Sequence, residues 1–137
     1  MEELSNFAIK HNIPVTQTVM GYSTMKRDHS HYAGQIGGLG GKNTNDLAKE
    51  TDLAIAVGTK LADFTTGSWA NFENENFKLL SINVSRFDAN KHLAQAVVGD
   101  AKVSLIELSK ALGDWKVGDE WNQKSQRELK IWNDHID

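Results

Sequence analysis

The chain contains no cysteine and a single proline among its 137 residues. The lack of cysteine excludes disulfide bonds, thiolate metal sites and cysteine nucleophiles. No apolar run approaches the length of about 20 residues that crosses a bilayer, and the N-terminus lacks the basic and then apolar layout of a secretion signal. The 15 Lys and Arg and 18 Asp and Glu give a net charge of -3 without a basic run. We therefore expect neither a membrane nor a nucleic acid as a partner.

The composition that is present is typical of a globular protein. Hydrophobic residues make up 39% and charged residues 24%, close to the averages for folded domains. We expect one folded domain over residues 1–113 and a helical linker over residues 114–137. Four apolar residues of this linker share approximately one helical face: Trp121, Leu129, Trp132 and Ile136. Such a stripe predicts that the helix packs against a partner surface.

Strand patterns alternate with helix patterns along the chain. The predicted strands are residues 13–18, a short strand at most near Gly34, and residues 53–57, 79–84 and 96–98. The predicted helices are residues 2–12, a helix that Asn43 or Thr44 caps and that ends near Glu50, residues 101–112 closed by Gly113, and residues 119–136. This alternation predicts an α/β fold with a parallel sheet, whose ligand sites lie at the carboxyl ends of the strands.

The order of elements at the N-terminus departs from this pattern. A fold of this kind should open with a strand, whereas this chain opens with a helix. We therefore expect the domain to lack its first strand and the sheet to contain a slot. Because unpaired backbone groups are costly, the slot predicts either association through that edge or a distorted fold.

Three stretches resemble the central domain of thiamine diphosphate-dependent enzymes: Ile13-Pro14-Val15 followed by Gly21, Thr51 to Thr59 with Asp63-Phe64, and Leu80 to Val84 followed by Val98-Gly99-Asp100-Ala101. Two longer motifs resemble the trihydroxycyclohexanedione hydrolase branch of these enzymes. They are Asp63-Phe64-Thr65-Thr66-Gly67-Ser68-Trp69 and Asn83 to His92. The resemblance covers most of the chain. It implies a three-layer, Rossmann-like α/β domain.

The resemblance also implies an activity for the whole enzyme. Enzymes of this branch are cytoplasmic and open the ring of 3D-(3,5/4)-trihydroxycyclohexane-1,2-dione to 5-deoxy-glucuronate, in inositol breakdown, with thiamine diphosphate and magnesium. The cofactor supplies the electron sink for carbon-carbon cleavage. In the family, the flanking pyrimidine-binding and diphosphate-binding domains hold the cofactor and the metal, and the chains form homo-oligomers. We therefore expect no catalytic residue, metal ligand or cofactor in this segment, which alone should be inactive.

One group of candidate site residues follows the predicted strand 53–57. The candidates are Asp63, Phe64, Thr65, Thr66, Ser68 and Trp69. The polar members are placed to hydrogen-bond a polyhydroxylated substrate, and Phe64 and Trp69 to pack against a neighbouring domain. Substrate contact and interdomain packing both stay open. Thr66-Gly67-Ser68-Trp69-Ala70 is not the Gly-x-Ser-x-Gly elbow of a serine hydrolase.

A second group resembles the nucleotide-type pocket of flavin- or adenine-binding relatives. Its members are Gly38, Gly40, Gly41, Arg86, Asp88 and His92. A glycine loop before a helix can cradle a phosphate, but no Gly-x-Gly-x-x-Gly can be found here, and a plain tight turn is the competing interpretation. Ser85 replaces the usual acidic residue after the strand, which favours a structural cap. The alternatives are a stand-alone FAD, NAD or ADP-binding module and another thiamine diphosphate enzyme such as an acetolactate synthase.

Overall fold

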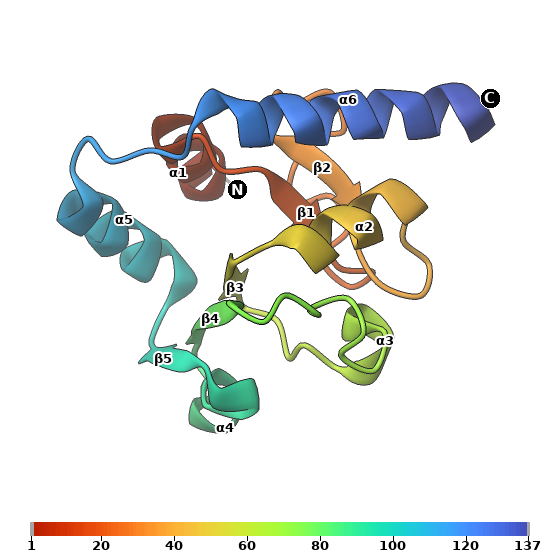
Figure 1. Cartoon of the computed structure of the whole chain (residues 1–137). Helices are drawn as coiled ribbons and strands as arrows, with labels where there is room; N and C mark the ends of the chain where they lie inside the picture. The colour runs from red at the N-terminus through yellow and green to blue at the C-terminus, as the bar shows by residue number, and fades with distance from the viewer. Residues whose placement is uncertain (1, 137) are drawn as a thin grey trace.

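The computed structural model describes residues 2–136 and contains helices alternating with short strands (Figure 1). The strands are β1 (Val15–Gln17), β2 (Tyr32–Gln35), β3 (Leu53–Val57), β4 (Lys78–Asn83) and β5 (Gln95–Val98). The helices are α1 (Glu2–His11), α2 (Lys42–Glu50), α3 (Asp63–Thr66), α4 (Arg86–Ala89), the short 3-10 turn η1 (Lys91–Leu93), α5 (Ala101–Leu112) and α6 (Asp119–Ile136). The predicted alternation is therefore confirmed, with α3, α4 and η1 added inside segments that were expected to be loops.

Strands β3, β4 and β5 form a parallel sheet with β4 in the middle. Leu53 pairs with Lys78 and Val57 with Ile82, so the two apolar runs are neighbours in register. Leu80 in turn pairs with Gln95 at the start of β5. The sequence-based prediction that residues 53–57 and 79–84 are adjacent parallel strands is confirmed.

The strands form two separate sheets, in agreement with the slot in the sheet that the sequence predicted. β1 and β2 pair with each other in parallel and form a separate two-stranded sheet. In Figure 1 the arrows of β1 and β2 form one group and those of β3, β4 and β5 form another. Within residues 2–136 no strand lies between β1 and β3 to hydrogen-bond with both, so the ladder is interrupted there.

The long helices begin and end where local chemistry favours it, with one correction. The Asp100 carboxylate accepts a hydrogen bond from the Val103 N–H at 2.9 Å and caps α5, and Gly113 ends that helix with a φ of 59°. The predicted cap of α2 is wrong, because Gly41 takes the N-cap position and Asn43 and Thr44 lie inside the helix. The Thr44 hydroxyl instead donates to the Ala33 carbonyl of β2 at 2.8 Å.

The core is built on the faces of both sheets. Phe7 of α1, Ile82 of β4 and Leu105 of α5 form one cluster, which shows that α1 and α5 cover the same face of the three-stranded sheet. A second cluster contains Ala8, Met25 and Tyr32 and lies against the two-stranded sheet. A third, around Ala56, Leu61 and Leu79, includes the partly buried Trp69 and Phe77. α1 therefore contributes to the packing of both sheets.

The tail helix α6 packs on β2 and α2, and its predicted partner surface lies within this chain. Leu129 packs against the cluster around Met25 and Tyr32, and the Gln126 amide donates to the Tyr32 carbonyl at 2.8 Å. Trp132 reaches the turn at Gly41. Trp121, Leu129 and Trp132 are half-buried and Ile136 is 62% exposed, so the predicted stripe is only partly covered. None of the helices within residues 2–136 combines the length and apolarity that crossing a membrane requires.

Candidate functional site at the carboxyl ends of the strands

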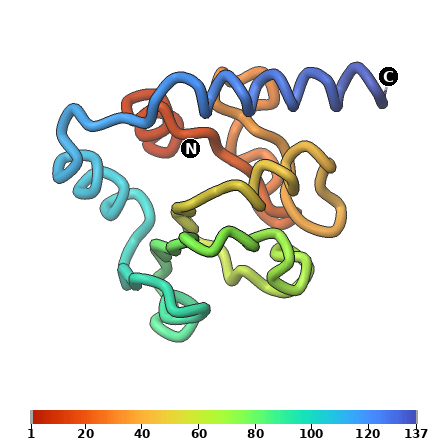
Figure 2. Tube along the Cα trace, in the orientation of Figure 1, coloured from red at the N-terminus to blue at the C-terminus, as the bar shows by residue number. Residues whose placement is uncertain are grey.

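Three segments that follow strands β2, β3 and β4 gather at one edge of the molecule. The glycine loop, residues 36–41, follows β2, the α3 segment, residues 58–72, follows β3, and the α4 segment, residues 84–93, follows β4. The Cα trace shows the α3 and α4 segments in the lower half of the view (Figure 2). Carboxyl ends of parallel strands are where this class of fold binds ligands. Both groups of residues predicted from the sequence lie in these three segments.

The glycine loop and the α3 segment are in direct backbone contact. The Gly38 N–H donates to the Phe64 carbonyl at 2.9 Å. A Cβ atom at Gly37 would lie 2.6 Å from the Phe64 carbonyl oxygen, and Gly37 has a φ of 102°. A Cβ at Gly38 would lie 2.9 Å from the Phe64 ring. Gly37 is thus required by the close approach of two backbones and Gly38 by its contact with the Phe64 ring, reasons that apply without any ligand.

Two asparagines that the sequence analysis did not single out clamp these segments together. The Asn45 side chain of α2 accepts from the Gly37 N–H at 3.0 Å and donates to the Gly37 carbonyl at 3.1 Å. The Asn71 amide then donates to the Asn45 Oδ1 atom at 3.1 Å. The only signal in the sequence was the position of Asn45 four residues after Gly41, because asparagine often bonds backbone near a turn.

The four glycine N–H groups of the glycine loop are already used inside the protein. Gly37 donates to Asn45, Gly38 to Phe64, Gly40 to the Gly37 carbonyl at 2.8 Å and Gly41 to the Gln35 carbonyl at 3.2 Å. A phosphate cradle needs such N–H groups to point at the ligand. The four glycine N–H groups of this loop are therefore not free to bind a phosphate in this structure.

The α3 residues divide into exposed and buried members. Asp63, Phe64 and Ser68 are exposed, Thr65 is half-buried, and Thr66 is 1% exposed. The Thr66 hydroxyl donates to the Ala62 carbonyl and accepts from the Trp69 N–H at 3.1 Å, so it shapes the turn. The groups that remain free to meet another molecule at this turn are the Asp63 carboxylate, the Phe64 ring and the Ser68 hydroxyl.

Trp69 and His92 connect the α3 and α4 segments. Their rings stack with centroids 4.1 Å apart and an interplanar angle of 21°. The His92 Nε2 atom donates to the Leu61 carbonyl at 3.1 Å, which fixes the imidazole as a donor at that nitrogen. Trp69 also lies against Phe72 and Phe77. The structure thus brings one member of each predicted group into contact.

Arg86 and Asp88 lie on α4 and do not converge on a cavity. The Ser85 hydroxyl accepts from the Asp88 N–H at 3.3 Å, which makes Ser85 the cap of α4, as the sequence indicated. Lys91 hydrogen-bonds the Asp88 carboxylate at 2.8 Å and lowers its pKa, so this group stays ionised and is unsuited to act as a general acid. Arg86 is exposed.

Backbone strain is concentrated at this edge. Of the seven non-glycine residues with positive φ in the described chain, five lie here: Leu61, Ser68, Trp69, His92 and Leu93. Such conformations cost on the order of 1–3 kcal/mol each and persist where the surroundings hold them. Phe87 and Leu93 are in addition 78% and 102% exposed. The edge therefore combines a rigid backbone with exposed apolar side chains.

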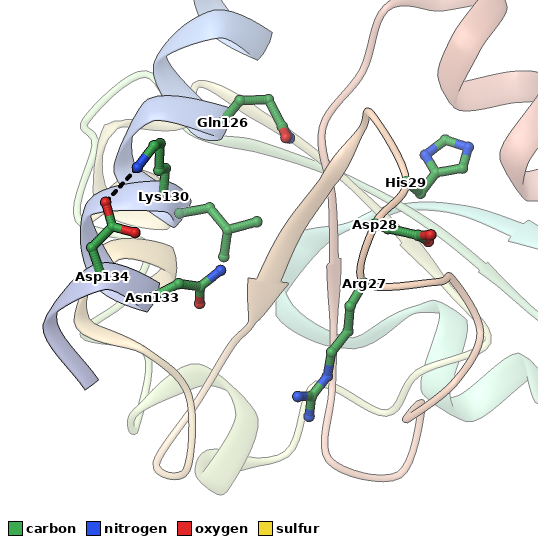
Figure 3. Close-up of a pocket in the computed structure, with 8 residues that line it drawn as sticks. Arg27, Asp28, His29, Gln126, Lys130, Asn133 and Asp134 are labelled. Carbon is green, nitrogen blue, oxygen red and sulfur yellow. Dashed lines mark hydrogen bonds and ion pairs between the residues drawn. The ribbon is translucent and has the colours of Figure 1, made fainter. Parts of the chain in front are cut away.

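One shallow depression lies away from this edge. A shallow depression of about 320 Å³ separates the 27–29 turn from α6 (Figure 3). Figure 3 shows Lys130 and Asp134 turned toward each other on α6, where they form an ion pair, and Arg27 extends along the opposite wall. Within residues 2–136 no group of three or more His, Asp or Glu side chains gathers to hold a metal ion.

The comparison with known families agrees with this architecture. The family described as "Thiamine pyrophosphate enzyme, central domain" matches residues 1–108, where thiamine pyrophosphate is another name for thiamine diphosphate. This chain belongs to that family. The central-domain family assignment accounts for the parallel strands, and the resemblance seen in the sequence is confirmed.

Three similar proteins share the same name. The central domain described here is 36% identical over 135 residues to a 3D-(3,5/4)-trihydroxycyclohexane-1,2-dione hydrolase of Clostridium perfringens (strain 13 / Type A), covering 98% of this chain and 21% of that protein. Proteins of the same name from Bacillus cereus (strain AH820) and Bacillus anthracis (strain A0248) are each 44% identical over 107 residues, covering 78% of this chain and 17% of theirs. The chain thus spans about a fifth of the length of these relatives.

Proposed function

We propose that this chain is the central domain of a hydrolase that opens the ring of 3D-(3,5/4)-trihydroxycyclohexane-1,2-dione to 5-deoxy-glucuronate by carbon-carbon bond cleavage in inositol catabolism. The observation that carries the proposal is the 36% identity to a protein of that name across 98% of this chain. The same branch of the family is supported by two sequence motifs, Asp63 to Trp69 and Asn83 to His92.

In this proposal the domain is structural, and other domains of the same polypeptide supply the chemistry. Thiamine diphosphate, when bound, provides the electron sink for cleavage of the bond between two carbons. We assign its binding, and that of magnesium, to flanking pyrimidine-binding and diphosphate-binding domains. The glycine N–H groups of the loop in this chain already donate hydrogen bonds within the chain. We place the complete enzyme in the cytoplasm as a homo-oligomer.

The α3 segment is the part of this chain that we assign to the entrance of the active site or to a domain interface. Its support is the stack of Trp69 on His92 and the contact of Phe64 with the glycine loop, which hold exposed Asp63 and Ser68 in fixed positions. A fixed backbone is what a binding or docking surface needs, since ordering it on binding would weaken the complex.

Assaying the isolated chain and the complete polypeptide side by side tests the proposal. We expect turnover of the dione by the complete protein in the presence of thiamine diphosphate and magnesium, and none by the 137-residue chain. Comparable rates from both would overturn the structural role. If the complete protein does not turn over the dione but does turn over pyruvate, the result would instead favour an acetolactate synthase.

Substitutions in the complete protein separate substrate contact from interdomain packing. Asp63→Ala and Ser68→Ala should raise KM for the dione several-fold if these groups bind substrate, whereas Phe64→Ala should lower the unfolding temperature if the ring packs on another domain. Glu75→Ala is the matched control, because Glu75 is exposed and forms no ion pair within residues 2–136. Unchanged kinetics and stability in all three variants would remove the α3 segment from both roles.

The stand-alone nucleotide-binding module is the competing function, and calorimetry distinguishes it. We expect no heat of binding when FAD, NAD or ADP is titrated into the isolated chain. Micromolar binding of any of them would favour the module.

A further inference from the structure

The tail helix α6 has 18 residues and buries little apolar surface for its length. Its one fully buried residue is polar, Ser125, at 1% exposure. Within residues 2–136, Leu129 is the one α6 residue that packs against an apolar cluster, and Trp121 and Trp132 are half-buried. The shorter α5, in contrast, buries Leu105 to 4% exposure. Because a helix in a protein is stabilised mostly by packing of its apolar face, α6 gains less from packing than α5 does.

Buried polar atoms without a partner gather where α6 meets the rest of the chain. In residues 2–136 three buried side-chain atoms form no hydrogen bond: Asn122 Oδ1, Ser125 Oγ and Asn43 Oδ1. Two of them belong to α6. The third lies beside it, since a Cβ at Gly41 would be 2.3 Å from Asn43 Oδ1 and 3.0 Å from the Trp132 Nε1 atom. A buried polar atom without a partner opposes the contact that buries it.

The contacts that oppose this cost are few. Beyond its first turn, α6 makes three polar contacts with residues 2–118: the Gln126 amide donates to the Tyr32 carbonyl at 2.8 Å, the Asn122 amide donates to the Ser30 carbonyl at 3.3 Å, and Lys124 forms an ion pair with Glu50. Half-exposed ion pairs of this kind contribute little to stability. The depression of about 320 Å³ runs along α6 and separates its second half from the 27–29 turn (Figure 3).

The segment that leads from α5 into α6 is fastened much more firmly. His11 of α1 is 0% exposed, and its Nδ1–H donates to the Trp115 carbonyl at 2.6 Å. The Val117 N–H donates to the His11 carbonyl at 2.9 Å. The Asn12 amide donates to the Val117 carbonyl at 3.0 Å and to the Asp119 carboxylate at 2.9 Å. These bonds form a clasp between the end of α1 and the start of α6.

We propose that α6 is a releasable strap: beyond its first turn the helix detaches from β2 and α2 as one unit, while the clasp of His11 and Asn12 keeps its start on α1. Release uncovers the surface of Met25 and Tyr32 that Leu129 covers. Elements that move in conformational switching are drawn from the least stable parts of a fold, and α6 is such a part. The inference does not rest on the hydrolase proposal.

Native-state hydrogen exchange of the 137-residue chain, followed by NMR, tests the strap. A detached helix of this length is only marginally stable in water, so the amides of α6 exchange once it is released. After correction for intrinsic rates, we expect the amides of residues 124–132 to exchange at least about tenfold faster than those of residues 105–109 in α5. The Val117 amide belongs to a connecting segment, yet it should exchange as slowly as α5, because the clasp holds it.

One substitution should close the strap rather than open it. Ser125→Ala removes the unpaired hydroxyl, so it should slow exchange throughout residues 124–132 by about fivefold or more and leave α5 unchanged. Gln123→Ala, at an exposed residue of α6, is the matched control, since it brings a similar gain in helix propensity and should slow exchange by about twofold at most. Gln126→Ala should have the opposite effect and speed exchange by about fivefold, because the Tyr32 carbonyl loses its donor.

Three results would overturn the inference. The first is exchange in α6 as slow as in α5, which would mean that α6 opens only when the whole chain unfolds. The second is a gradient in which exchange slows steadily from residue 136 toward residue 121, because that is fraying of a helix end and not release of a unit. The third is an equal effect of Ser125→Ala and Gln123→Ala. None of these results bears on the hydrolase proposal, which depends on turnover by the complete protein.

Discussion

The three-stranded sheet of β3, β4 and β5 and the two-stranded sheet of β1 and β2 are held by different kinds of contact. The first is anchored by buried apolar side chains, with Ile82 at 1% exposure between Phe7 and Leu105. Around the second, buried polar groups bond to backbone, as where the Gln17 amide donates to the Met25 carbonyl at 2.8 Å. The first sheet thus depends mainly on buried apolar area, whereas the second combines the apolar cluster of Ala8, Met25 and Tyr32 with buried polar groups that bond to backbone.

Because of this difference, different changes should destabilise the two sheets. Loss of apolar volume should harm the first sheet at every pH, because transfer of hydrocarbon from water does not involve protons. The second sheet depends on groups whose partners are lost when one atom is replaced or protonated. The following substitutions are chosen to expose that contrast.

Removing volume beneath the three-stranded sheet should have the largest effect. Ile82→Ala deletes a side chain that is 1% exposed and should lower the free energy of unfolding by about 4 kcal/mol, measured by urea denaturation. Val103→Ala on α5, at a residue 58% exposed, is the control and should change it by less than about 0.5 kcal/mol. If Ile82→Ala does not fold, Ile82→Val should still cost about 1 kcal/mol. Equal effects for Ile82 and Val103 would contradict the apolar anchoring.

Disrupting the contact between the glycine loop and the α3 segment should have the next largest effect. Gly37→Ala places a Cβ 2.6 Å from the Phe64 carbonyl at a φ of 102°, so it should cost about 3 kcal/mol and separate the glycine loop from α3. Gly118→Ala is the control, because nothing lies within 4 Å of its Cβ position. Unfolding curves measure the cost, and the Trp69 environment can be followed by near-ultraviolet circular dichroism. A neutral Gly37→Ala would show that the loop shifts freely.

The sequence predicted most of the elements but not how they meet. Apolar runs identified β3 and β4 because their residues are those of covered parallel strands, and Asp100 and Gly113 marked the ends of α5 by local chemistry. The split into two sheets agrees with the slot expected from the sequence, but the strands on either side of it could not be named in advance, since β3 carries the sequence of a central strand in a position with one neighbour. Local patterns report preference, and pairing depends on what is nearby.

The sequence predicted where the candidate site lies but not the contacts between its residues. Residues 63–69 and 86–92 were placed at the carboxyl edge by the order of strands alone, and they do lie there. The stack of Trp69 on His92 joins residues far apart in sequence, and the Asn45 and Asn71 clamp uses polar residues without periodicity. Glycine at residue 37 suggested a phosphate turn, whereas contact with Phe64 explains it. Such long-range contacts leave no local pattern.

A single hydroxyl beneath the two-stranded sheet should have a smaller effect. Thr44 is fully buried and its hydroxyl donates to the Ala33 carbonyl at 2.8 Å. Thr44→Val keeps the volume and leaves that carbonyl unpaired, which should cost about 2 kcal/mol in urea denaturation. Thr24→Val, at an exposed residue, is the control and should be nearly neutral. A neutral Thr44→Val would mean that polar contacts do not hold this sheet.

The smallest effect should come from protons at His31. Asn12 donates its amide N–H groups to the Val117 carbonyl and to Asp119, so its Oδ1 atom must accept from the Nε2–H of neutral His31 at 3.0 Å. Burial first, and the neighbouring His29 second, lower the pKa of His31 in the folded protein. The unfolded chain therefore binds a proton more readily.

The sign of the pH effect follows from that difference. Stability is complete above the unfolded pKa of about 6.5 and falls on acidification from there down to the lower folded pKa, with a slope below about 1.4 kcal/mol per pH unit for one proton. Urea denaturation between pH 8 and about pH 5 should show this loss. His31→Gln should flatten the profile while His135→Gln, at an exposed residue of α6, leaves it unchanged. Because Ile82→Ala itself removes no titratable group, its cost should vary little over the same range, and a cost that varied strongly with pH would show that the two sheets are not independent.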